Sequence, residues 1–353
     1  MMKVAIILFN LGGPDSPKAV RPFLRNLFND PAIITVPGPI RWFLSHLISL
    51  RRAPIAREIY QHLGGKSPLL GLTRKQAQAL EDQFDGGDEV KTFIAMRYWH
   101  PMSDETAQAV KSFAPERIIL LPLYPQFSTT TTGSSLTDWQ RAARQADINV
   151  PTIAICCYPE EPGFISAIAT QTVAAIKEAA KSGNPRVLFS AHGLPRKIVD
   201  GGDPYVDHVE MTAAAIVENI AQTDLDWTVC YQSRVGPLEW VGPATEDEIE
   251  RAGRDGIPLV VVPIAFVSEH SETLVELDIE YKELAFACGV PAYHRVRTVC
   301  SDLSFIGGLK NLVDLALETI KKGDIDESLK ISSYSNDRIC SNHCPKCPNT
   351  QRN

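Results

Sequence analysis

Residues 258–281, PLVVVPIAFVSEHSETLVELDIEY, decide the fold class of this chain. Their first part, residues 259–267, is short, apolar and rich in β-branched side chains, which is typical of a buried parallel strand. Ser268 offers a helix N-cap, and apolar residues then recur at helical spacing at Leu274, Leu277, Tyr281 and Leu284. The stretch therefore predicts a strand that leads directly into a helix, as in α/β proteins.

The predicted helix, residues 268–283, has a row of carboxylates nearly opposite its apolar face. These residues are Glu269, Glu272, Glu276, Glu280 and Glu283. His270 lies among them at the carboxyl end of the strand, where open α/β sheets bind their ligands. Alone, such a row is more often a solvated helix face than a site.

A second histidine at an equivalent position favours a site. In residues 187–195, VLFSAHGLP, an apolar strand ends at His192, and Gly193 and Pro195 then force a turn. A lone histidine at a strand end is more often structural, but two such ends are better explained by one shared crevice. Imidazole and carboxylate together suit a divalent metal, proton removal, or both.

Apolar strands alternate with helical stretches along the chain. The predicted strands are residues 3–9, 91–97, 117–123, 152–156, 186–190, 228–231 and 259–267. This alternation is typical of parallel sheets flanked by helices, so the predicted fold class is α/β.

The sequence also repeats itself loosely. ILFNLGGP at residues 7–14 resembles LFSAHGLP at residues 188–195. We therefore predict two Rossmann-like lobes with a cleft between them: an N-terminal lobe over residues 1–150 and a C-terminal lobe over residues 151–330. A cysteine-rich tail, residues 331–353, follows.

The bulk properties exclude several classes of protein. The chain has 353 residues, enough for two domains with real cores, and 44% of them are hydrophobic. A formal charge of −7 without a basic run argues against a nucleic-acid partner. We see no secretory signal and no apolar run near the roughly 20 residues that span a bilayer, so we expect a cytoplasmic protein.

Residues 37–52, PGPIRWFLSHLISLRR, complicate that expectation. They predict a short helix with bulky apolar side chains flanked by Arg41, Arg51 and Arg52. This composition suits peripheral contact with the inner face of a membrane or a lip over an apolar ligand. A helix packed in the core is an equally good interpretation.

Three cysteines lie close together in the tail: Cys340, Cys344 and Cys347. Since cytoplasmic proteins rarely hold disulfides, clustered thiols indicate a metal. The C-x3-C-x2-C spacing also occurs in radical SAM enzymes, but there it follows an early barrel strand, so we reject that interpretation. Zinc with His343 and an iron–sulfur cluster with a fourth cysteine both remain open.

With these segments in hand, the chain resembles the ferrochelatase family from about Val4 to Leu317. The matching motifs are LFNLGGP (8–14), RRAPIAREIY (51–60), MRYWHPMSDE (96–105), YPQFSTTTTGSS (124–135), LFSAHGLP (188–195), YQSRVGPLEWVGP (231–243) and SEHSETLVELDIEY (268–281). Several separate motifs in the right order make the resemblance specific. It implies two Rossmann-like lobes that clamp a porphyrin, with ferrous iron and protoporphyrin IX as substrates.

The resemblance also implies roles for individual residues. His192 matches the family's active-site histidine and Glu272 the carboxylate that faces it, so both are expected to act in catalysis and to contact the iron. An acidic path would continue through Glu269, Glu276 and Asp278. The matching pocket residues are Leu11, Arg52, Tyr60, Arg97, Tyr98 and Trp240. Residues 37–52 match the lip that shields the porphyrin.

The chemistry of metal insertion agrees with these roles. A planar porphyrin holds two pyrrole protons inward, and binding it in a saddled shape exposes its nitrogen lone pairs to the metal and its protons to a base. We expect His192 to accept protons while Glu272 assists metal delivery or proton exit. The opposite assignment, with His192 as an iron ligand, stays open.

The tail resembles the extension of ferrochelatases that hold a [2Fe–2S] cluster, which implies Cys340, Cys344 and Cys347 as ligands. The chain departs from the animal pattern, because Ala167 occupies the position of the internal ligand there. Cys157 is our expected fourth ligand, with Cys156 as the alternative.

Other functions remain to be weighed. A chelatase of the same class could act on coproporphyrin or insert cobalt into another tetrapyrrole, and a two-lobed protein could be a non-catalytic iron carrier. The lip helix and the absence of a signal peptide speak against a carrier. The sequence allows a homodimer and does not decide the oligomeric state.

Overall fold

A computed structural model describes residues 2–84, 86–234, 236–321 and 330–331, with backbone alone for 319–321 and 330–331. The chain divides into two compact units. The first contains the described residues of Met1–Cys157 and of Leu309–Ile339, and the second is Tyr158–Gly308.

The first unit is built on a parallel five-stranded sheet. Its strands, in spatial order, are β2 (Glu89–Met96), β1 (Lys3–Asn10), β3 (Arg117–Pro122), β4 (Thr152–Ile155) and β9 (Lys330–Ile331). β1 pairs with neighbours on both sides and is almost wholly buried, which explains its continuous apolar sequence. Its Phe9 packs edge-on against Trp139, with 6.2 Å between the ring centroids.

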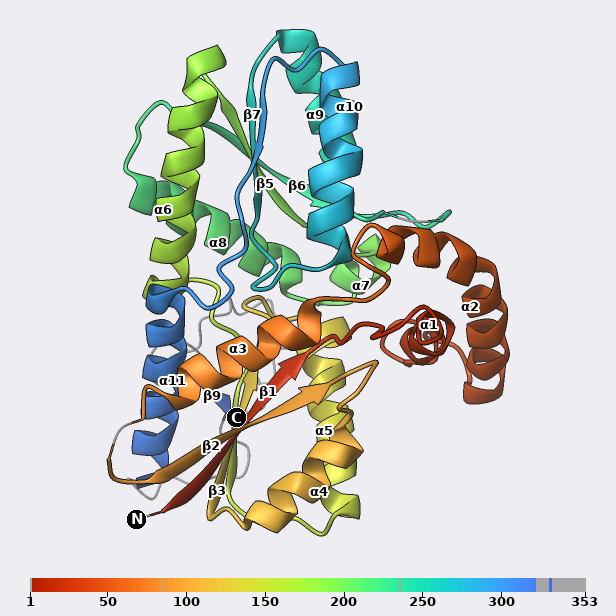
Figure 1. Cartoon of the computed structure of the whole chain (residues 1–353), viewed down its shortest axis with the longest axis vertical. Coiled ribbons are helices and arrows are strands. Elements are labelled where there is room, and N and C mark those ends of the chain that lie inside the picture. Colours follow the sequence, from red (N-terminus) through yellow and green to blue (C-terminus); the bar gives the residue numbers. More distant parts are fainter. Residues whose placement is uncertain (1, 85, 235, 322–329, 332–353) are drawn as a thin grey trace. The chain divides into compact units, whose positions relative to one another are not determined.

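Helices α3 (Leu69–Glu81), α4 (Ser103–Phe113) and α5 (Ser134–Gln145) flank this sheet, while α1 (Val20–Phe28) and α2 (Gly38–Gln61) lie beside it and pack on each other (Figure 1). A five-residue π-helix, η1 (Thr129–Gly133), immediately precedes α5. Residues of α11 (Leu303–Lys321) from Leu309 onward also belong to this unit.

Helix α2 places its bulky apolar side chains outward. The helix buries only small side chains along most of its length, at Ser45, Ser49 and Ala53, together with Tyr60 near its end. The exposed large apolar residues are Ile40, Trp42, Phe43, Leu50 and Ile55. The prediction of a helix over residues 37–52 is confirmed and the helix extends further, but α2 does not bury its apolar side chains as a core-packed helix would.

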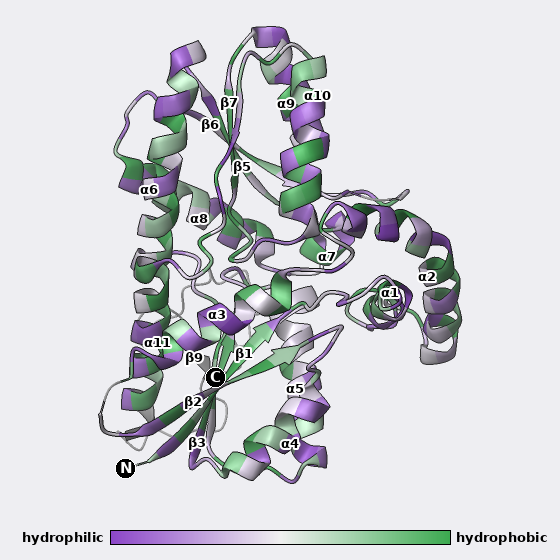
Figure 2. Cartoon of the chain, viewed as in Figure 1, coloured by the Kyte–Doolittle hydropathy of each residue, from purple (hydrophilic) through white to green (hydrophobic). Residues whose placement is uncertain are grey.

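The second unit is built on a parallel four-stranded sheet. Its strands, in spatial order, are β6 (Asp226–Gln232), β5 (Arg186–His192), β7 (Leu259–Pro263) and β8 (Tyr293–Arg295). Its helices are α6 (Pro162–Ala179), α7 (Arg196–Asp200), α8 (Tyr205–Ile220), α9 (Thr245–Asp255) and α10 (Tyr281–Ala287), with a 3-10 turn, η2 (Ala180–Ser182). Strand β5, with the sequence RVLFSAH, is hydrophobic in its central part and polar at both ends, while α10 alternates between the two colours (Figure 2).

Two parallel sheets flanked by helices confirm the predicted α/β fold class. Within the described residues, no helix combines the length and the apolar character needed to cross a membrane.

The deciding stretch differs from its prediction in three respects: the strand is shorter, the helix begins later, and the helix starts as a π-helix. β7 ends at Pro263, and the helix begins only at residue 271 and runs as a nine-residue π-helix, η3 (Glu272–Glu280), before α10. Ser268 is therefore not the N-cap, and that prediction was wrong. Local hydrogen bonds explain the later start, because the Thr273 hydroxyl accepts from the backbone N–H of His270 at 3.0 Å and donates to its carbonyl oxygen at 3.1 Å.

Candidate active site

His192 is the last residue of β5, and the local geometry fixes its tautomer. Nδ1 lies 2.6 Å from the carbonyl oxygen of Gly193. Because a carbonyl oxygen only accepts, Nδ1 must be the protonated nitrogen and must donate this bond. Nε2 is then left as an acceptor, 3.7 Å from Oε1 of Glu272. The half-exposed imidazole can therefore accept a proton on the side that faces Glu272.

Glu272 lies between two histidines at the start of η3. Its Oε2 is 3.4 Å from Nε2 of His270, whose ring packs on Phe266 at 4.5 Å. Burial alone raises the pKa of Glu272, but the charge of His192 when it is protonated, the hydrogen bond with His270 and the charge of His270 when it is protonated outweigh it and lower the pKa to about 2. Protonation of His192 therefore holds Glu272 in its ionised form.

Glu276, four residues further along η3, accepts several hydrogen bonds. Gln232 Nε2 donates at 2.9 Å, the Ser233 N–H at 2.8 Å, the Ser233 hydroxyl at 2.5 Å and the Tyr281 hydroxyl at 3.1 Å. Burial, followed by the charge of Glu272, raises the pKa of Glu276 above its ordinary value. The two carboxylates thus differ, since one stays charged and the other holds a proton more readily.

The other two carboxylates of the predicted acidic path are already paired. Arg295 of β8 contacts Glu269 at 2.7 Å and Asp278 at 2.5 Å and 2.8 Å. Burial raises the pKa of Glu269, but Arg295 and the hydrogen bonds around it lower the pKa overall. Among the described residues of the predicted path, Glu276 is the carboxylate without a basic partner within 4 Å. Arg295 was not among the predicted site residues.

Trp240 lies against the turn that follows His192. Its backbone bridges to Pro195, and the next N–H, of Val241, donates to the Leu194 carbonyl at 3.0 Å. A Cβ atom added to Gly193 would approach the Trp240 ring at 3.2 Å and the Gln232 carbonyl at 2.9 Å. Only glycine fits this turn without displacement, so the close approach explains why Gly193 follows His192.

In the first unit, Arg97 and Tyr98 form a buried network with Asp30. Arg97 Nη2 lies 2.9 Å from the Asp30 carboxylate, and the Tyr98 hydroxyl donates to it at 2.7 Å. Ser134 also donates to Asp30 and accepts from Arg97 Nε at 2.7 Å. Burial, followed by the Asp30 charge, raises the pKa of Tyr98 well above its ordinary value. Asp30, which lies in the turn between α1 and α2, was not among the predicted site residues.

The remaining predicted pocket residues of this unit lie on or near α2. Tyr60 is buried in a hydrophobic cluster that includes Tyr98, and Leu11 packs against that cluster. Arg52 is exposed on α2. The structure thus brings Leu11, Tyr60 and Tyr98 together in the first unit, and His192, Glu272, Glu276 and Trp240 lie in the second.

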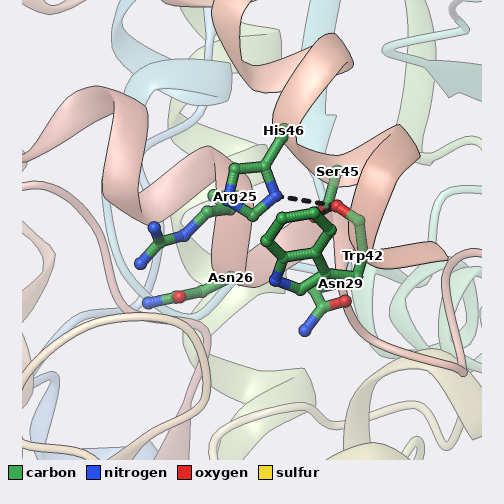
Figure 3. Close-up of a pocket in the computed structure, with 6 residues that line it drawn as sticks. All are labelled: Arg25, Asn26, Asn29, Trp42, Ser45 and His46. Atoms are coloured by element: carbon green, nitrogen blue, oxygen red, sulfur yellow. Dashed lines mark hydrogen bonds between the residues drawn. The ribbon is translucent and has the colours of Figure 1, made fainter. Parts of the chain in front are cut away.

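A cavity of about 260 Å³ lies beside α2, lined by residues of α1, α2 and the turn after α1: Arg25, Asn26, Asn29, Trp42, Ser45 and His46 (Figure 3). The Trp42 and His46 rings lie 4.1 Å apart, and His46 Nδ1 donates to the Trp42 carbonyl at 2.8 Å. This cavity contains none of the predicted site residues.

Two of the cysteines predicted as cluster ligands, Cys157 and its alternative Cys156, lie within the described residues. Cys156 and Cys157 are buried beside Phe127, with 3.5 Å between their sulfur atoms. Cys340, Cys344 and Cys347 lie outside the described residues. Within the part of the chain that the structure describes, no three His, Cys, Asp or Glu side chains gather closely enough to hold a metal ion.

Comparison with solved structures shows the class of fold, and comparison with similar sequences shows the family. Among solved structures, SirB from Bacillus subtilis with Fe3+ matches with a TM-score of 0.55 at 12% identity, covering 92% of this chain and 99% of that one. A second SirB structure, the sirohydrochlorin chelatase of Bacillus subtilis subspecies spizizenii with cobalt, gives a TM-score of 0.51. The fold is therefore that of the chelatases.

The family model named ferrochelatase matches residues 3–317. Ferrochelatase from Caulobacter vibrioides is 53% identical over 88% of this chain and 89% of its own length. Those of Pelagibacter ubique and Rickettsia bellii are 48% and 49% identical over 98% of this chain and over 98% and 94% of their own lengths. The chain belongs to the ferrochelatase family, lyases that insert ferrous iron into a porphyrin, and the predicted function is confirmed.

Proposed function

We propose that this ferrochelatase uses protoporphyrin IX and that His192 accepts the pyrrole protons while Glu272 assists the iron. The observation that supports these roles most directly is the pair of contacts made by His192. Nδ1 is tied to the Gly193 carbonyl, so the basic Nε2 faces a carboxylate 3.7 Å away. A base held in one tautomer and an adjacent ionised acid meet the needs of metal insertion.

The reaction releases two protons for each iron bound. The porphyrin nitrogens lose two N–H protons as they take up Fe²⁺, so the oxidation state of the iron does not change. His192 Nε2 accepts a proton, and the ionised Glu272 stabilises the imidazolium that results. Glu276, with its raised pKa, is the next group able to take a proton from this region. Carboxylates also replace water around a divalent ion as it enters.

The proposed porphyrin contacts are of two kinds, apolar contacts with the macrocycle and a charged contact with a propionate. Leu11 and Trp240 supply apolar surface for the macrocycle, and the exposed Arg52 supplies a charge for a propionate. Arg97, Tyr98 and Tyr60 would shape the pocket wall, since their polar groups or rings are already packed within the first unit. Coproporphyrin has four carboxylates where protoporphyrin has two, and the apolar outer face of α2 favours the less polar ring.

The test is an anaerobic assay with Fe²⁺ and each porphyrin, followed by absorption spectra and mass analysis of the product. His192→Ala should abolish haem formation while porphyrin fluorescence still reports binding. His100→Ala is the matched control, because His100 also pairs with a glutamate, Glu105, yet lies outside the proposed site. Preserved turnover in His192→Ala would refute the assignment. Production of coprohaem alone would refute the choice of porphyrin, and tight iron binding without turnover would favour the carrier.

We also propose that α2 forms a lip that contacts a membrane surface. Its support is the outward position of Trp42 and Phe43, 57% and 61% exposed, near the exposed Arg51 and Arg52. Trp42→Glu/Phe43→Glu should lose cosedimentation with anionic vesicles. Binding unchanged by the double substitution would contradict the proposal.

We further propose a [2Fe–2S] cluster with Cys340, Cys344 and Cys347 as ligands and Cys157 as the fourth. The support is the C-x3-C-x2-C spacing and the donor type, because thiolates are the usual ligands of such clusters and the first unit holds two more cysteines, Cys157 and its neighbour Cys156, both buried. When bound, the cluster would cross-link the tail to the domain. The visible absorption of the purified protein should be lost in Cys157→Ser; loss only in Cys156→Ser would reassign the ligand. A homodimer and a cytoplasmic location stay predictions.

A further inference from the structure

Gln232 lies beside both residues of the proposed catalytic pair, His192 and Glu272. It is the last residue of β6 and wholly buried, and in the sheet register it lies directly opposite His192. Its carbonyl oxygen accepts the N–H of Gly193 at 2.7 Å, in the turn that fixes the His192 tautomer. The backbone of Gln232 therefore helps to hold the histidine.

The side-chain amide of Gln232 forms hydrogen bonds with the backbone of Glu272 and with the carboxylate of Glu276. Nε2 donates to the carbonyl oxygen of Glu272 at 3.1 Å and to Oε2 of Glu276 at 2.9 Å, and Oε1 accepts from Ser190 Oγ at 2.9 Å. The orientation of the amide is unambiguous, because a carbonyl and a carboxylate only accept. Both amide N–H groups are thus committed to η3, and Ser190 prevents the amide from rotating.

We propose that Gln232 is a positioning residue for metal insertion, which sets the separation between His192 and Glu272. Glu272 begins a π-helix, and π-helical turns are rare and occur frequently at functional sites. The Gln232 amide donates to the backbone carbonyl of Glu272 and so holds the first residue of this helix. The inference rests on the proposed roles of His192 and Glu272.

A buried glutamine could instead serve stability alone. Tyr293 provides the comparison, because its hydroxyl donates to the carbonyl of Leu277 in the same π-helix at 2.7 Å and the residue is also buried, with 8% exposed. Tyr293 contacts neither His192 nor Glu272 in any hydrogen bond described. Substitution at either position removes a buried hydrogen bond to η3. Of the two residues, Gln232 is the one that also lies beside His192 and bonds to Glu272.

The test compares Gln232→Met, which keeps the side-chain size but removes both polar atoms, with Tyr293→Phe. Because displacement of a catalytic group by about 1 Å can cost about 100-fold in rate, we expect kcat of Gln232→Met to fall by about 10–100-fold. The Kd for porphyrin, from fluorescence quenching, should stay within about threefold of wild type. Tyr293→Phe should keep its kcat even where its melting temperature falls.

Two further variants make the result decisive. Ser190→Ala removes the bond that Gln232 accepts and leaves the two it donates, so its loss in kcat should be under about fivefold. If Gln232→Met does not fold, Gln232→Glu replaces it, since it keeps the acceptor for Ser190 and places a second carboxylate against Glu276. A folded Gln232 variant with normal kcat, or an equal loss in Tyr293→Phe, overturns the proposal. An active His192→Ala would instead overturn the proposed site.

Discussion

Replacing Arg295 by methionine should destabilise the second unit by about 3–5 kcal/mol, the usual cost of removing one partner from a buried ion pair. The Arg295 side chain is only 7% exposed and pairs with two carboxylates. The Glu269 side chain is 14% exposed, so its charge would be left almost without water or a counter-ion. Asp278 is 35% exposed and can regain hydration. Most of the cost should therefore arise at Glu269.

The difference in unfolding free energy between the wild type and Arg295→Met should depend on pH. In the wild type the pKa of Glu269 lies below its ordinary 4.5, so its stabilising effect is complete above that pH and is lost only on further acidification. Removal of Arg295 takes away the charge that most lowers this pKa and leaves burial, which raises it, so Glu269 of the variant should protonate at a higher pH than in the wild type. The variant should therefore gain stability relative to the wild type as falling pH protonates the acid. The difference in unfolding free energy should therefore shrink from about pH 8 to about pH 5.5.

Urea unfolding followed by tryptophan fluorescence across that pH range measures the difference. Arg186→Met is the control, because Arg186 also bridges two carboxylates, but Asp226 and Asp255 are 38% and 42% exposed. We expect it to cost less than about 2 kcal/mol, with no comparable change with pH. A loss below about 1 kcal/mol in Arg295→Met, or a loss independent of pH, would refute the argument.

Two further predictions concern stability. Gly308→Ala should destabilise the second unit, because the added Cβ would collide with the Glu161 carboxylate, whereas Gly307→Ala meets nothing within 4 Å and should stabilise α11 by about 0.5–1 kcal/mol; thermal denaturation of the pair checks both signs. Asp30→Asn should cost about 3 kcal/mol because it removes the buried carboxylate 2.9 Å from the Arg97 guanidinium and leaves only Asp138, 3.9 Å away, and a melting temperature near wild type would contradict this.

The α/β fold could be predicted because continuous apolar strands such as residues 3–9 and 259–267 are a local signal. His192 was singled out because it ends an apolar strand, and Glu272 because it belongs to the acidic row that follows another; the family resemblance then implied their roles. The π-helix was not predicted, because its apolar residues also fit α-helical spacing. Arg295 was missed because its pairing with the acidic row depends on β8 lying beside β7, with Val261 opposite Arg295. Contacts between elements distant in sequence leave no local pattern.

The outward side chains of α2 have a thermodynamic consequence. Water ordered around Ile40, Trp42, Phe43, Leu50 and Ile55 raises the heat capacity of the free protein. Any partner that covers this face, whether a macrocycle or a bilayer, releases that water, and its binding enthalpy must become more favourable as temperature rises. Titration calorimetry at several temperatures would therefore measure how much of α2 each partner covers.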